Sequence, residues 1–115
     1  MPHTDPELVA WAGARGVPTL PGAASPTEVL AAWRAGAAAV KVFPASVLGA
    51  AFVRECRGPF PDIPLMPTGG VTADNARSLI EAGAVAVGVG SWLAGAPDET
   101  TLRERATALM AAVNG

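Results

Sequence analysis

Two stretches of the chain, TLPGAASPTEVLAAWRAGAAAVKVF (residues 19–43) and LMPTGGVTADNARSLIEAGAVAVGVG (residues 65–90), repeat one pattern with one residue inserted. In both, a turn is followed by a helix cap, a helix, an Ala-Gly-Ala stop and an apolar strand. Strands that are apolar on both faces and alternate with helices are typical of a parallel sheet covered by helices. The repeat therefore predicts an α/β fold.

The same alternation extends through the rest of the chain. Short strands, each followed promptly by a helix, favour a (βα) barrel over a doubly wound sheet. Four strands make half of an eight-stranded barrel, so we expect residues 1–115 to form a single half-barrel domain. The expected strands lie near residues 17–21, 38–43, 63–68 and 84–90, and the expected helices, about five, lie at 4–16, 25–36, 49–58, 72–83 and 98–113.

Composition narrows the function classes. Half of the 115 residues are apolar and 16% are charged, which is typical of a folded domain and not of a disordered chain. A net charge of −2 argues against a nucleic-acid or anionic-membrane partner. The single cysteine, Cys56, excludes an internal disulfide and fits a reducing compartment. With no signal peptide or membrane span in the pattern, we expect a soluble cytoplasmic protein.

Lys41, the only lysine in the chain, interrupts an apolar strand. Side chains alternate along a strand, so Lys41 and Phe43 share one face while Val40 and Val42 share the other. If the valines pack under helices, Lys41 points into the barrel, where burial favours the neutral amine that can attack a carbonyl. Two structural readings stay open: the lysine could extend to a strand edge, or it could pair with a carboxylate.

Glycines follow two neighbouring predicted strands, as Thr68-Gly69-Gly70 and as Gly88-Val89-Gly90-Ser91. Glycine lets backbone N–H groups approach an anion closely, and barrels commonly bind phosphate in the loops after their last two strands. The pair of loops therefore predicts a phosphate site. The alternative is that Gly69-Gly70 only makes a strand-to-helix turn.

The acidic residues lie outside the predicted strand ends, where the site is expected. All ten carboxylates fall on predicted helices, caps or loops that lead into strands, and none falls where a strand ends. The chain therefore offers no proton shuttle beside Lys41. It also has no cluster of metal ligands, and we expect neither a metal nor a cofactor.

Three stretches, VKVFPAS (residues 40–46), GPFPDIPLMPTGGVTADNA (58–76) and AVGVGSWL (86–93), resemble the 2-keto-3-deoxy-6-phosphogluconate (KDPG) aldolases and the related 4-hydroxy-2-oxoglutarate aldolases. The resemblance implies a (βα)₈ barrel, typically a trimer, that cleaves an aldol to pyruvate and an aldehyde through a lysine Schiff base, as in the Entner–Doudoroff pathway. It makes Lys41 the Schiff-base lysine, with Phe43 and Pro44 around it and Thr68 at the pyruvate end. By the same resemblance the substrate phosphate is held by Gly69, Gly70, Gly90 and Ser91.

The resemblance begins after the family's fourth strand, so the chain is similar to the C-terminal half of such a barrel. The family's glutamate base belongs to the other half, and we expect this chain to form a homo-oligomer or to pair with a separate N-terminal half. The expected small-molecule partner is a phosphorylated keto acid. Two other functions remain open: a non-catalytic half-barrel that binds phosphate, and a thiamine-phosphate-synthase-like enzyme, which the lysine in VKVFPAS disfavours.

Overall fold

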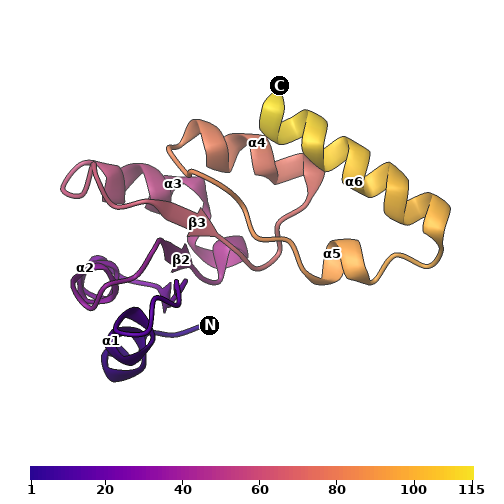
Figure 1. Cartoon of the computed structure of the whole chain (residues 1–115). Coiled ribbons are helices and arrows are strands. Elements are labelled where there is room, and N and C mark those ends of the chain that lie inside the picture. The colour runs from indigo at the N-terminus through magenta and orange to yellow at the C-terminus, as the bar shows by residue number, and fades with distance from the viewer.

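The computed structural model describes all 115 residues and contains a three-stranded parallel sheet with six helices (Figure 1). The strand order is β1-β2-β3, each strand being followed along the chain by a helix. The strands are β1 (Gly22–Ala23), β2 (Val40–Val42) and β3 (Leu65–Pro67). The helices are α1 (Pro6–Gly13), α2 (Pro26–Arg34), α3 (Ala45–Arg57), α4 (Ala73–Glu81), α5 (Ser91–Ala94) and α6 (Glu99–Asn114).

The helices begin where the sequence places their caps. The side chains of Asp5, Ser25, Thr72 and Asp98 each accept a hydrogen bond from a backbone N–H of the first turn of α1, α2, α4 or α6. Such a cap satisfies a donor that has no partner within the helix, and losing one typically costs about 1 kcal/mol. α3 starts at Ala45, earlier than expected, but the helical backbone is interrupted within it at Gly49 (φ 71°, ψ −179°).

The sheet has one face covered by helices and one open face, which is covered only at Gly22, by the backbone of Pro2. Val40, Val42 and Leu65 are fully buried and face the helices, as expected for a strand that packs under a helical layer. The register pairs Lys41 with Gly22 on one side and with Met66 on the other, so these three residues form a row on the opposite face. Lys41 and Met66 are only half-buried.

The first expected strand is displaced from residues 17–21. Thr19, Pro21 and Ala23 accept hydrogen bonds from the chain around β2, but the regular ladder is confined to Gly22–Ala23. Pro18 and Pro21 have no N–H to donate, which shortens the ladder at that end.

The fourth expected strand, 84–90, is reduced to a single parallel bridge between Thr68 and Gly88. The N–H groups of Val85 and Gly88 donate to the carbonyls of Leu65 and Pro67, respectively. Gly88 lies three residues after Val85, whereas Pro67 lies two residues after Leu65, so the pairing of the two segments shifts by one residue. Pro67 cannot donate in return. The structure therefore shows a three-stranded parallel sheet, without the fourth strand of the expected half-barrel.

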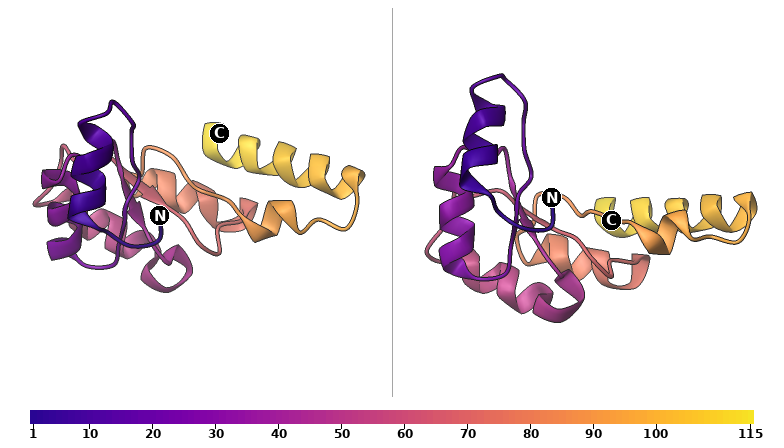
Figure 2. Two further views of the ribbon diagram at one scale, coloured as in Figure 1. Left: turned by 60° about the horizontal axis from the view of Figure 1, so that its bottom comes forward. Right: turned by 90° about the horizontal axis from the view of Figure 1, so that it is seen from below.

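The C-terminal region extends the molecule. α1 and α6 lie at opposite ends in both views of Figure 2, and the molecule measures 42 × 30 × 22 Å. α6 packs along α4 and has no fully buried residue, although Leu109 and Val113 contact the core. α5, a single turn, was not expected from the sequence. None of the six helices is both long enough and apolar enough to span a bilayer.

Candidate active site at the strand ends

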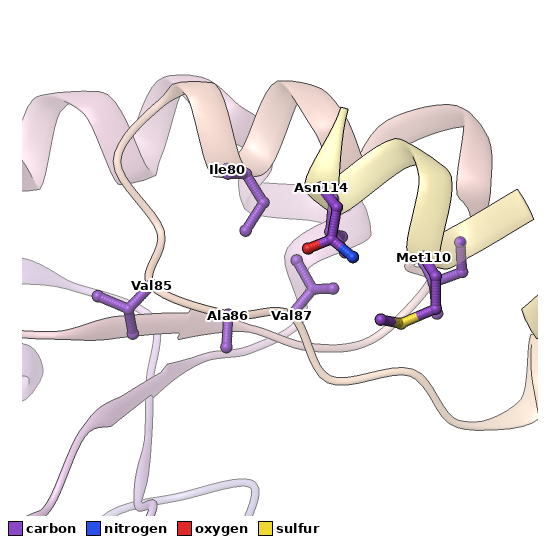
Figure 3. A pocket seen from close by; sticks show the side chains of 8 residues that line it. Ile80, Val85, Ala86, Val87, Met110 and Asn114 are labelled. Atoms are coloured by element: carbon purple, nitrogen blue, oxygen red, sulfur yellow. The ribbon is translucent and has the colours of Figure 1, made fainter. Parts of the chain in front are cut away.

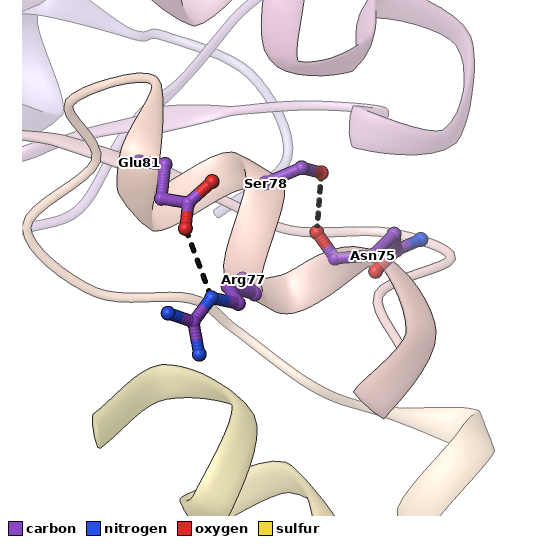
Figure 4. A network of polar contacts seen from close by, with 4 residues as sticks. All are labelled: Asn75, Arg77, Ser78 and Glu81. Carbon is purple, nitrogen blue, oxygen red and sulfur yellow. Dashed lines mark hydrogen bonds and ion pairs between the residues drawn. The ribbon is translucent and has the colours of Figure 1, made fainter. Parts of the chain in front are cut away.

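Lys41 lies on the open face of β2, as the alternation of side chains predicts. Its Nζ is 5.2 Å from the centroid of the Phe43 ring, so the two side chains share this face. No carboxylate pairs with Lys41: the two ion pairs of the chain join Arg77 to Glu81 and Arg103 to Glu99. The Arg77 pair runs along the surface of α4, beside the hydrogen bond between Ser78 and Asn75 (Figure 4).

The start of α3 is joined to the end of β3. The N–H groups of Ala45 and Ser46 donate to the carbonyls of Thr68 and Gly69, at 2.8 and 2.9 Å. Because these carbonyls occupy the first amides of α3, that end of the helix offers few free donors. The Phe43 ring fills the space beside Gly69, where a Cβ would lie 3.1 Å from the ring carbon Cε2. Phe43 is linked to Pro44 by a cis peptide bond.

Thr68 lies where β3 meets the 84–90 segment. Its hydroxyl donates weakly to the Met66 carbonyl, at 3.4 Å. A Cβ at Gly88 would lie 2.3 Å from Thr68 Oγ1, so only glycine fits at that position. The bridge between Thr68 and Gly88 brings the two glycine loops out of the sheet side by side.

The two glycine loops carry free backbone donors. Gly69 and Gly70 both have a left-handed φ, of 96° and 70°, which favours glycine at these positions. The N–H groups of Gly69, Gly70, Gly90 and Ser91 donate no hydrogen bond within the chain. Clustered unpaired amides are the usual means by which a backbone binds an anion.

Two residues that shape the first glycine loop were not identified from the sequence. Asn75 donates from its side chain to the Gly70 carbonyl at 2.9 Å, and its Oδ1 accepts from the N–H of Thr72. Ser46 packs against Gly70, where a Cβ would lie 2.6 Å from the Ser46 Cβ. The only sequence signal for Asn75 was its position three residues after the cap Thr72, which is typical of a capping box.

An apolar pocket of about 330 Å³ lies elsewhere, between α4, α6 and residues 85–87 (Figure 3). Ile80 and Val87 line it together with the α6 residues Leu109 and Met110. None of the predicted site residues lines this pocket. Seven of its eight lining residues are hydrophobic and the eighth is the uncharged Asn114, so no charged side chain is present to orient a charged substrate.

Cys56 is a buried residue of α3, and burial raises the pKa of its thiol above the ordinary value of 9.0, with a further contribution from the nearby Glu55 charge. A thiol in this state is a poor nucleophile. No group of three or more histidine, cysteine or acidic side chains is arranged to hold a metal ion.

Comparison with known proteins agrees with the resemblance carried by the motifs. The model of the KDPG and KHG aldolase family matches residues 1–106. A probable 2-dehydro-3-deoxy-6-phosphogalactonate aldolase of Rhizobium meliloti is 37% identical over 113 residues, which cover 96% of this chain and 53% of that protein. A 2-dehydro-3-deoxy-phosphogluconate aldolase of Pseudomonas aeruginosa is 40% identical over 93 residues, covering 80% of this chain and 42% of the relative.

A solved structure of a similar protein also supports the resemblance to these aldolases. A structure described as native KDPGal superposes with a TM-score of 0.91 at 32% identity, over 99% of this chain and 56% of the other. The chain thus spans about half the length of the relatives it matches. On the family match and these relatives, the chain belongs to the KDPG and KHG aldolase family.

Proposed function

We propose that this chain supplies the Schiff-base lysine and the phosphate-binding loops of a class I aldolase. The observation that carries the proposal is the position of its only lysine, which lies half-buried on an open sheet face with no carboxylate partner. The free amides of Gly69 and Gly70 follow the neighbouring strand. The relatives are named as aldolases of phosphorylated 2-dehydro-3-deoxy sugar acids, which fits a site that binds an anion next to an amine.

The proposed reaction begins with attack of the Lys41 amine on the keto carbon of the substrate, and loss of water gives an iminium ion. A base then removes the proton of the hydroxyl on the carbon to be released, the carbon–carbon bond breaks, and its electron pair moves into the iminium to form an enamine. The aldehyde leaves. Protonation of the enamine and hydrolysis release pyruvate and restore the amine.

Each remaining residue has a part in this scheme. Phe43 and Pro44 form the wall beside the amine, and Thr68 contacts the pyruvate-derived end. The amides of Gly69, Gly70, Gly90 and Ser91 hold the substrate phosphate. Candidate substrates are 2-keto-3-deoxy-6-phosphogluconate, its galactonate isomer and 4-hydroxy-2-oxoglutarate, the last of which carries a carboxylate where the others carry phosphate.

No carboxylate of residues 1–115 pairs with Lys41, so the ion pairs of this chain identify no base beside the lysine. We propose that the base comes from the half of the barrel that the relatives have and that residues 1–115 do not cover. The same observation favours a second candidate function, a phosphate-binding half-barrel without catalysis.

The decisive experiment is borohydride reduction of the chain in the presence of pyruvate, followed by peptide mass spectrometry. We expect one reduced pyruvyl adduct on the peptide that contains Lys41. The control variant Lys41→Arg keeps the charge but cannot form the adduct. The only other primary amine of this chain is the N-terminal amine, which donates a hydrogen bond to the Leu20 carbonyl. Because this amine could also react, the mass spectrum must show which peptide carries the adduct.

The two candidate functions give different results. An adduct confined to Lys41 supports the aldolase. Absence of an adduct, with shifts of the Gly69 and Gly90 amides on addition of phosphate, supports the non-catalytic half-barrel and refutes the Schiff-base proposal.

A further inference from the structure

Arg105 connects α6 to α5, the short helix that follows the second glycine loop. Its Nη1 donates to the carbonyl of Trp92 at 2.5 Å, across 13 residues of sequence. The guanidinium carbon also lies 5.5 Å from the centroid of the Trp92 ring. Both side chains are half-buried, so this contact is partly shielded from water. A planar guanidinium can stack on an aromatic ring and donate a hydrogen bond at the same time.

The other arginine on this part of α6 has a different role. Arg103 pairs with Glu99 four residues earlier on the same helix, and both side chains are at least three-quarters exposed. Such a pair contributes little to stability and does not reach another element. Arg105 alone on α6 forms a side-chain hydrogen bond to another helix. Figure 1 shows α5 lying beside the first half of α6.

Trp92 follows directly after Gly90 and Ser91, whose amides are free. A contact that holds the Trp92 carbonyl also limits the positions that these two amides can adopt. The first glycine loop, residues 68–70, is held by a different side chain, because the Asn75 amide donates a hydrogen bond to the Gly70 carbonyl. The two halves of the proposed phosphate site are thus held by separate side chains.

We propose that Arg105 is a positioning residue that holds the Gly90–Ser91 amides in place for the phosphate. This inference rests on the phosphate site proposed above. It predicts that loss of Arg105 weakens phosphate binding through the second glycine loop, while the Gly69 and Gly70 amides still respond.

The test is an NMR titration of the ¹⁵N-labelled full chain with inorganic phosphate. In the wild-type chain, we expect the amides of Gly69, Gly70, Gly90 and Ser91 to shift together. Arg103→Ala, the matched control on the same helix, should behave as wild type. Arg105→Ala should weaken phosphate binding about fivefold, as expected for one hydrogen bond, and should reduce the shifts at Gly90 and Ser91. Arg105→Lys, which keeps the charge but not the planar group, should fall between the two.

The outcomes separate this inference from the function on which it rests. If the wild-type amides do not respond to phosphate, the phosphate site and the inference both fail. If the wild type responds and Arg105→Ala shows the same affinity at the same amides, only the inference is overturned. Should Arg105→Ala lose its helical circular dichroism, Arg105→Lys is titrated in its place, and wild-type affinity in that variant overturns the inference.

Discussion

Replacement of Gly88 by alanine tests whether the 84–90 segment is held against Thr68 as closely as the structure shows. The new methyl carbon would lie 2.3 Å from Thr68 Oγ1, 3.0 Å from its Cγ2 and 3.1 Å from its Cβ, whereas carbon contacts are optimal at about 3.5–4.0 Å. Rotation of the threonine side chain does not relieve the overlap, because Cβ itself is too close. Overpacking of this kind typically costs about 1–3 kcal/mol.

The assay is urea unfolding followed by circular dichroism, with Thr68→Ala and the double variant completing a mutant cycle. We expect Gly88→Ala to lower the unfolding free energy by about 2 kcal/mol. Thr68→Ala removes the two nearest atoms, so the double variant should recover at least about 1 kcal/mol of the summed loss. The control is Gly13→Ala, at the end of α1, where a Cβ meets nothing within 4 Å. It should leave stability unchanged or raise it by up to about 1 kcal/mol.

Unfolding of Gly88→Ala at the wild-type urea concentration would show that the 84–90 segment is not held closely against Thr68. Simple additivity of the two substitutions would show that the cost does not arise from the contact with Thr68.

Three further predictions concern the core and two titrating groups. Leu65→Ala should lower the unfolding free energy by about 3 kcal/mol, because Leu65 is fully buried in the sheet. Leu102→Ala, near the exposed start of α6, should lower it by much less in the same urea assay. The hydrogen bond from the Thr101 N–H lowers the pKa of Asp98 below its ordinary 3.8. The cap therefore stabilises the fold above pH 3.8 and loses this effect as the pH falls through the lowered pKa. In Asp98→Asn, the urea midpoint should depend less on pH across this acid range. The pH dependence from Cys56 has the opposite sign because its pKa is raised: the unfolding free energy should fall as the pH rises above 9.0, and Cys56→Ala should remove this dependence. Mass spectrometry should find that iodoacetamide labels the thiol only when the protein is unfolded in urea.

The helices were more predictable than the strands because their signals are local. The caps Ser25 and Thr72 act on backbone groups within three residues, so a short sequence window contains both partners. A strand depends on a partner far along the chain. Residues 84–90 are apolar enough to predict a buried strand. Pro67 on the neighbouring strand has no N–H to donate to this segment, however, and only a single bridge forms.

The candidate site shows the same division. The face on which Lys41 lies followed from alternation along one strand and is confirmed by the burial of Val40 and Val42. The contacts of Ser46 with Gly70, and of Arg105 with Trp92, join elements that no local pattern relates. The roles of the predicted site residues remain predictions that the trapping and titration experiments test.

The packing of α6 has a consequence for hydrogen exchange. A helix with no fully buried residue can detach at a lower free energy than the sheet it leaves, so its amides should exchange well before those of β2 and β3. If Arg105 holds the phosphate loop, binding and detachment are linked, and the linkage acts in both directions. Phosphate should then slow exchange along α6, even at residues far from the anion.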